Sequence, residues 1–200
     1  SGREEVVLQE YIHRPMLIGR RKFDIRAFCL VASVKPTLVL RYQDFYVRRS
    51  CEPFTDDLTR RSAHLTNISV QKHHHKFGEE SVWSLAQLDA WLKTHNAPTL
   101  LNDQIMPSID AAMCACVRSV QPVLAETAGC FQLLGFDVML DHTGHVQLLE
   151  VNRNPDLEPH TRGLHQLLTR LVHETLDVAT EVNLRKSRGE GELWPLACEH

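Results

Sequence analysis

The sequence predicts a mixed α/β (α+β) fold in which a largely antiparallel sheet is flanked by helices. Two pairs of β-branched and apolar runs predict the sheet, residues 26–33 with 37–42 and residues 130–140 with 145–152, because each pair is joined by a short polar turn. Later stretches repeat apolar residues at helical spacing, as in the run from Leu164 to Val182, and predict the helices.

The length and composition bound the class of protein. Two hundred residues correspond to about one domain, and 43% hydrophobic with 24% charged residues are ordinary globular values that exclude a disordered chain or a fibrous repeat. The six cysteines lie mostly in apolar runs, which is typical of reduced thiols in a cytosolic protein rather than of a secreted disulfide framework. No run of 18 apolar residues occurs, so we expect no membrane partner.

The net charge of −3 is the sum of two opposite halves. Residues 1–76 hold 14 basic and 8 acidic residues (+6), whereas residues 77–200 hold 8 and 17 (−9). Taken whole, the chain has no bulk attraction for nucleic acid, and we expect none as a partner. The basic half can attract an acidic partner.

The elements follow in order along the chain. Residues 34–36 form the turn between the first two strands, and the polar residues 50–62 are expected to form a loop. Ser84 and Gln87 form a capping-box pattern that predicts a helix after Trp83. The next helix is expected within residues 103–127, where Pro107 is tolerable in the first turn and Pro122 bends or stops the helix.

The second hairpin carries the most specific chemistry. If its four-residue loop closes on Leu140 and His145, Asp137 lies opposite Leu148 and one diagonal step from Glu150. Side chains alternate between faces, so Asp137, Glu150 and Asn152 share one face. Three oxygen ligands without nearby Cys or His favour magnesium over zinc. The alternative is a solvated outer face, which the apolar surroundings of these carboxylates make less favourable.

A second polar face precedes the hairpin in the sequence. Lys22, Asp24 and Arg26 alternate with apolar residues, so they share one face of a strand and can meet polyphosphate in a cleft. A charged edge strand that faces water explains the same alternation equally well. No glycine-rich phosphate loop occurs, so a bound nucleotide would be held by side-chain cations and magnesium.

Several motifs resemble, in order, those of the tubulin-tyrosine-ligase-like family. They are Gln9-Glu10-Tyr11-Ile12, residues 21–26, residues 42–48 followed by 52–54, His64-Leu65-Thr66-Asn67 with Gln71-Lys72, Phe136-Asp137, and Leu149-Glu150-Val151-Asn152. The resemblance covers roughly residues 6–182 and implies the ATP-grasp fold. Members of that family ligate amino acids onto proteins, chiefly tubulin.

The resemblance implies a role for each matching residue. Gln9, Tyr11 and Ile12 would form the adenine hinge, and Lys22 and Asp24 would contact the nucleotide. Arg26 and Arg48 would meet the terminal phosphate and the acyl intermediate. Thr66, Asn67 and Lys72 would line the nucleotide site, and Asp137, Glu150 and Asn152 would hold magnesium. ATP and Mg2+ are the implied cofactors. Arg26, Arg48 and Glu150 form the implied catalytic set.

The function implied is ATP-dependent ligation of an amino acid to a protein carboxylate through an acyl phosphate, with a free amino acid and acidic tubulin tails as partners. The added residue, tyrosine, glutamate or glycine, stays open. The alternatives are an inactive tubulin-binding remnant and an ATP-grasp ligase that acts on another protein or peptide. The expected setting is the cytoplasm and the cytoskeleton, cilia included.

The same resemblance implies the organisation of the chain. Residues 1–184 would be the C-terminal part of the ligase domain, because the family's upstream part of the grasp has no counterpart here, and residues 185–200 would be a polar tail. The apolar residues 6–8 are expected to form a buried strand.

Overall fold

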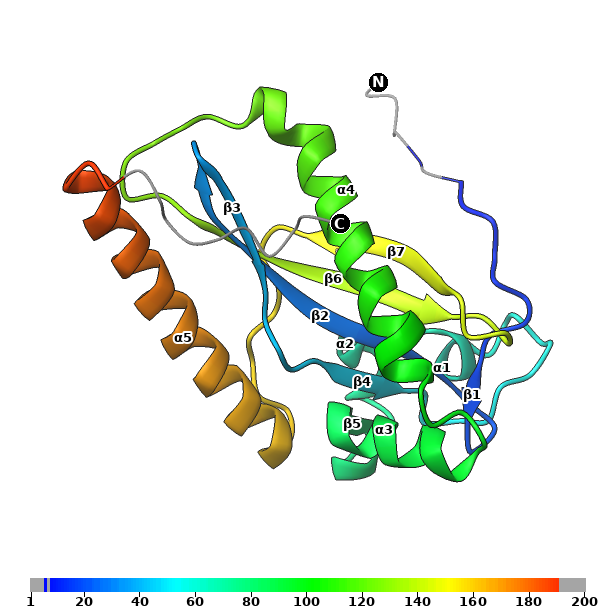
Figure 1. Ribbon diagram of the computed structural model, residues 1–200. Helices are drawn as coiled ribbons and strands as arrows, with labels where there is room; N and C mark the ends of the chain where they lie inside the picture. The colour runs from blue at the N-terminus through cyan, green and yellow to red at the C-terminus, as the bar shows by residue number, and fades with distance from the viewer. Residues whose placement is uncertain (1–5, 7, 191–200) are drawn as a thin grey trace, which may run out of the picture.

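The computed structural model describes Val6 and residues 8–190. Its centre is a seven-stranded sheet in which all strand pairs between described residues are antiparallel (Figure 1). The strands are β1 (Leu17–Ile18), β2 (Arg21–Val34), β3 (Thr37–Arg41), β4 (Tyr46–Arg49), β5 (Val82–Ser84), β6 (Gln132–Leu140) and β7 (Val146–Asn152). The main order is β5-β4-β2-β6-β7, with β1 and β3 also paired to β2. The predicted class, a largely antiparallel sheet flanked by helices, is confirmed.

The helices pack on both faces of this sheet. They are α1 (Arg61–His64), α2 (Ile68–Gln71), α3 (Leu85–Thr94), α4 (Met106–Val120) and α5 (Arg162–Ser187). One core cluster joins β2, β4 and β6 to α3 and α4, and a second joins β2 and β4 to α5. In Figure 1, α4 and α5 therefore flank opposite faces of the sheet.

The alternation of side chains along β2 organises both layers. Phe23, Ile25 and Ala27 point to the α3 and α4 side and are buried in the larger core. The other face begins with polar side chains, described below, and continues with Phe28, which packs beneath α5. On this face of β2, the first residues are therefore polar and the later residues are apolar. We call the first part the polar half-face of β2.

The predicted helix boundaries agree closely with the structure. Ser84 caps α3, since its hydroxyl accepts a hydrogen bond from the backbone N–H of Gln87 at 3.3 Å, and Gln87 Oε1 accepts from the Ser84 N–H at 2.8 Å. Pro107 lies in the first turn of α4, as expected. The helix ends at Val120, and Pro122 lies in the following 3₁₀ turn.

The last helix extends three residues into the stretch that was expected to be a polar tail. α5 continues to Ser187, because Arg185 pairs with Glu181 at 2.7 Å and Lys186 with Glu126 at 2.9 Å, which stabilises the last turn. Residues 191–200 lie outside the described residues. The domain boundary at residue 184 stays a prediction. No helix in the described part of the chain is long and apolar enough to cross a membrane.

The N-terminal expectation is wrong for the residues that the structure describes. Val6 and Leu8 are 76% and 96% exposed and belong to no strand, and Val7 lies outside the described residues. Their apolar character alone predicted a buried strand, but no sheet edge among the described residues pairs with them.

The hairpin of β6 and β7 has a different register from the predicted one. Leu140 pairs with Val146 instead of His145, so the loop is one residue longer than expected. The Asp141 carboxylate accepts a hydrogen bond from the His145 backbone N–H at 3.1 Å, which closes this loop locally.

A β-bulge compensates for that shift. A one-residue slip alone would place Leu149 opposite Asp137 and turn Glu150 to the other face. The register changes again between Asp137 and Val138, so that Glu150 lies directly opposite Asp137 and Leu149 is the extra residue. The shared face of Asp137, Glu150 and Asn152 is therefore present, although the predicted pairing was wrong.

Candidate active site

A cavity of about 290 Å³ lies over the polar half-face of β2. The predicted site residues that line it are Gln9, Tyr11, Ile12, Lys22, Asp24, Thr66, Asn67, Asp137 and Glu150. They come from the segment before β1, from β2, from the turn between α1 and α2, and from the β6–β7 hairpin. The fold thus gathers into one cavity residues that are distant in the sequence.

Four buried charges form the floor beside this cavity. Asp137 on β6 accepts from Arg26 Nη2 on β2 at 2.9 Å and lies 2.8 Å from Arg48 Nη2 on β4. Arg48 also donates to both carboxylate oxygens of Asp24, at 2.7 and 2.6 Å. Every one of the four is at most 5% exposed. Two arginines and two aspartates balance each other without solvent.

The network holds Asp137 and Arg48 in their charged forms. Burial alone would raise the pKa of Asp137, but hydrogen bonds from Arg26 and Arg48 and their positive charges keep that pKa below the ordinary value for aspartic acid. Burial would lower the pKa of Arg48, yet the charge of Asp24 outweighs it and the pKa is raised.

Asp24 lines the cavity and also belongs to this network. Its second oxygen accepts a hydrogen bond from the Thr66 hydroxyl at 2.7 Å as well as from Arg48. Thr66 is itself buried. Within the described part of the chain, Asp24 therefore holds Arg48 and Thr66 in place at the edge of the cavity.

A second hydrogen-bonded chain connects the cation of the cavity to a buried histidine. Lys22 Nζ donates to Tyr11 Oη at 3.0 Å, and Tyr11 Oη lies 2.7 Å from His64 Nδ1. His64 Nε2 lies 3.0 Å from the Asp57 carbonyl, which can only accept, so Nε2 carries the proton and Nδ1 accepts from Tyr11. Burial lowers the pKa of Lys22, which the charge of Asp24 partly offsets.

The three predicted metal ligands lie together. The Asn152 side-chain amide is 3.2 Å from Glu150 Oε1 and 3.5 Å from Asp137 Oδ2. Glu150 is exposed to the cavity and forms no ion pair with any described cation, unlike Asp137. The Asn152 amide nitrogen faces both carboxylates. The oxygens of Asp137 and Glu150 fit a hard divalent cation, and Asn152 would add its amide oxygen with the amide group turned over.

Four predicted residues do not line the cavity. Arg26 and Arg48 lie beside it against Asp137, Asn152 lies against Glu150, and Lys72 lies away from the cavity. The Lys72 side chain is 37% exposed and its amine lies 4.0 Å from Glu158. Its role in nucleotide binding stays a prediction. Conversely, sequence reasoning missed His64, Met139 and Leu149, which line the cavity. Met139 could have been found, because it follows Asp137 by two residues and so shares its face.

The geometry defines a class of site, in which cations and oxygen ligands meet over an antiparallel sheet. Residues 1–188 match the family model described as the tubulin-tyrosine ligase family. The chain belongs to that family, and the predicted resemblance is confirmed.

Relatives with this similarity carry several names. A probable tubulin polyglutamylase from Rattus norvegicus is 34% identical over 180 residues, which is 88% of this chain and 38% of the relative. A tubulin monoglycylase from Danio rerio is 29% identical over 92% of this chain and 25% of the relative. A probable alpha-tubulin polyglutamylase from Tetrahymena thermophila is 30% identical over 89% and 44%. The chain thus spans less than half the length of these relatives.

Replacing Asp137, the carboxylate that both arginines contact, should lower the stability of the folded protein. Asp137→Asn leaves Arg26 and Arg48 partly without a counter-charge, and we expect a loss of about 3–5 kcal/mol in the free energy of unfolding, measured by urea titration. The matched control is Asp110→Asn, which weakens the half-exposed pair with Arg41 and should cost at most about 1 kcal/mol. Equal losses in the two variants would contradict the buried network.

The same carboxylate predicts a pH dependence. Because the pKa of Asp137 is lower in the folded state, its contribution is complete above the unfolded value of about 4 and is lost as pH falls through the folded pKa. The free energy of unfolding should therefore fall steeply below about pH 4, and less steeply in Asp137→Asn. Urea titrations between pH 2 and 6 measure both slopes. Parallel curves would show that Asp137 does not carry the effect.

Proposed function

We propose that the chain is the C-terminal part of an ATP-dependent ligase domain that joins an amino acid to a carboxylate of a protein, with the acidic tails of tubulin as the acceptor. The observation that supports this most directly is the cavity that Lys22, Asp137 and Glu150 line together. Arg26 and Arg48 contact Asp137 beside it, and Asn152 lies 3.2 Å from Glu150. Family membership and the names of the relatives point to the same reaction class. The proposed setting is the cytoskeleton.

The residues present fit ATP with Mg2+. Glu150, Asp137 and Asn152 would hold the metal, which supplies Lewis-acid neutralisation of phosphate charge when bound. Asp137 is already shared by two arginines, whereas Glu150 faces no described cation, so we assign Glu150 as the principal ligand. Lys22 would meet a phosphate, and the segment from Gln9 to Ile12 would face the adenine.

The proposed reaction has two steps. The acceptor carboxylate attacks the terminal phosphorus of ATP, the bond to ADP breaks, and an acyl phosphate forms. The amine of the incoming amino acid then attacks the acyl carbon, and inorganic phosphate leaves as the amide bond forms. Arg26 and Arg48 would stabilise negative charge in both steps, and one well-placed donor is worth about 3 kcal/mol.

The acidic acceptor would be drawn to exposed cations near the cavity. Lys22, Arg26 and Arg48 are buried and Arg49 stacks on Trp83 at 4.4 Å, so these cations are not free to meet an acceptor. Arg20 and Arg61 are exposed and stand a few residues before the cavity residues Lys22 and His64. We assign these two arginines to the acceptor tail.

Removing the negative charge of Glu150 should abolish nucleotide binding and ligation. In the full-length protein, Mg-ATP at 100 times its Kd should stabilise the folded state by about 2.7 kcal/mol, and Glu150→Gln should lose this gain at the same concentration. Thermal shift measures binding, and incorporation of labelled tyrosine, glutamate and glycine into tubulin measures ligation. The control Glu174→Gln removes an exposed carboxylate of α5 outside the cavity.

The outcomes separate the proposed ligase from its alternatives. A wild-type protein that gains no stability from Mg-ATP would be an inactive remnant. Binding of Mg-ATP without labelling of tubulin would indicate another acceptor. Undiminished incorporation by Glu150→Gln would refute the metal assignment.

Reversing the exposed arginines should weaken binding of the acceptor. Arg20→Glu with Arg61→Glu should raise the Kd for an acidic tubulin-tail peptide, and added salt should reduce the wild-type affinity because the Debye length shortens from about 10 Å at 0.1 M to about 3 Å at 1 M. Fluorescence anisotropy measures both effects. Arg118→Glu, an exposed arginine on α4, is the control and should leave the Kd unchanged. An affinity independent of salt would contradict the assignment.

A further inference from the structure

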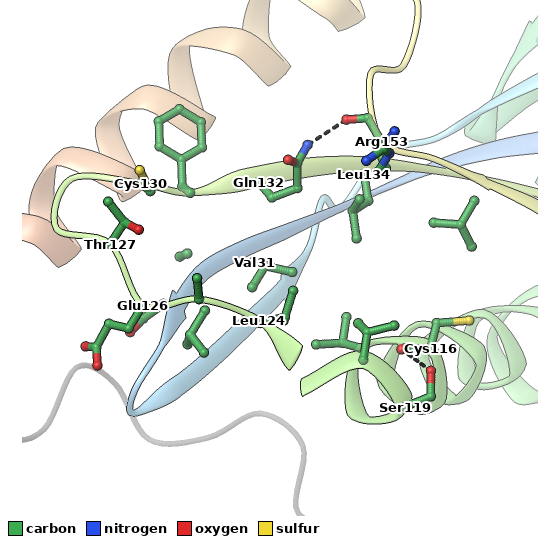
Figure 2. A pocket seen from close by; sticks show the side chains of 18 of the residues that line it. Val31, Cys116, Ser119, Leu124, Glu126, Thr127, Cys130, Gln132, Leu134 and Arg153 are labelled. Carbon is green, nitrogen blue, oxygen red and sulfur yellow. Dashed lines mark hydrogen bonds between the residues drawn. The ribbon is translucent and has the colours of Figure 1, made fainter. Parts of the chain in front are cut away.

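A larger cavity of about 660 Å³ lies near the other end of β2 (Figure 2). It is enclosed by the end of β2, the last turns of α4, the segment from residue 121 to 132 and the C-terminal part of α5. Val31 and Lys22 are nine residues apart on β2, so the two cavities are separated by roughly 30 Å. This cavity is distinct from the candidate active site.

Most of the surface that lines the cavity is apolar. Val31 and Val117 lie in its wall, and three exposed side chains form part of its rim, Val120 (44% exposed), Leu124 (36%) and Phe131 (38%). Figure 2 shows Val31 and Leu124 among the side chains that line it. A contiguous apolar hollow with an exposed apolar rim is typical of a binding site.

Two cations line the cavity, and Lys186 is paired whereas Arg153 forms no ion pair with another described residue. Lys186 Nζ is held by Glu126 at 2.9 Å and by Ser33 at 3.2 Å. The Arg153 guanidinium forms no ion pair with another described residue, although Gln132 binds its backbone carbonyl at 2.6 Å. An occupant with an apolar centre and an acidic flank would complement both features.

The end of α5 directs the following chain away from the helix axis. Gly189 has φ of 73°, a left-handed conformation that glycine adopts without strain. The Glu190 N–H bonds to the Arg185 carbonyl and the Gly189 N–H to the Lys186 carbonyl, each at 3.1 Å. This is the Schellman arrangement that ends a helix. The chain thus leaves α5 one turn after Lys186, which lines the hollow.

The sequence after Glu190 has an apolar centre and acidic residues on both sides, which complement the cavity. Residues 191–200 contain the apolar run Leu193-Trp194-Pro195-Leu196, the acidic Glu192 and Glu199, and no lysine or arginine. From Glu190, four extended residues reach at most about 14 Å, which brings Trp194 within range of a cavity lined by Lys186. Apolar centre, acidic flanks and reach all fit the hollow.

We propose that residues 191–200 of the same chain bind in this cavity, with Trp194 among the apolar side chains and an acidic flank beside Arg153. Docking of the segment covers the exposed rim formed by the end of α4 and the segment that follows it. The occupant is intramolecular.

The test uses ¹⁹F NMR of the full chain labelled with 5-fluorotryptophan. The chain has three tryptophans, and the resonance that disappears in Trp194→Phe is that of Trp194. A soluble gadolinium chelate reports how exposed each ring is. We expect Trp194 to be shielded and Val120→Asp to raise its relaxation enhancement severalfold. Leu176→Asp on α5, 49% exposed and outside the cavity, is the matched control and should change nothing.

A second variant keeps the test decisive if Val120→Asp disturbs folding. Arg153→Glu is an exposed charge reversal that should also release Trp194, whereas Arg118→Glu should not. An exposed Trp194 in the wild type, or equal release by the control variants, would overturn the proposal. Shielding that disappears on dilution would assign the cavity to a second copy and would overturn it as well.

Discussion

The carboxylate of Asp137, held between Arg26 and Arg48, is the interaction on which the site depends. Arg26 and Asp137 are direct partners across β2 and β6, and Asp24 and Arg48 are direct partners across β2 and β4. Two cross-strand ion pairs, joined by the contact of Arg48 with Asp137, therefore fix the central three strands against each other. That alignment places Lys22 on β2 and Asp137, the partner of Glu150, on β6 beside one cavity.

Such a network is a poor source of stability. Four charges with at most 5% exposure lose their hydration, and replacement of a buried ion pair by apolar residues is often neutral or stabilising. The benefit lies in orientation, because bidentate arginines have few alternative geometries. Asp137 gives its oxygens to the arginines, which leaves Glu150 as the freely available carboxylate. Rigid cations beside an available anion suit a phosphoryl-transfer site.

Patterns with short range could be predicted from the sequence, whereas contacts between strands could not. The alternation of Lys22, Asp24 and Arg26 placed them on one face correctly, and the Ser84 cap was visible from four residues. The register of the hairpin depended on how Asp141 folds its loop, and the bulge at Leu149 has no sequence signature. The pairing of Asp24 with Arg48 and the separation of Lys72 from the cavity depend on tertiary packing, so local sequence patterns could not predict them.

The same strand pattern explains why the cavity lies where it does. On one face of β2, Phe28 and Leu30 continue the row begun by the polar residues, and α5 can cover them because apolar side chains gain by burial. The preceding charged row is buried by other means, because Asp24 pairs with Arg48 and Arg26 with Asp137, and the cavity lies over Lys22 and Asp24. A helix therefore covers the face where it is apolar, and ion pairs and the cavity occupy it where it is charged, so that one alternating sequence specifies both the core and the site.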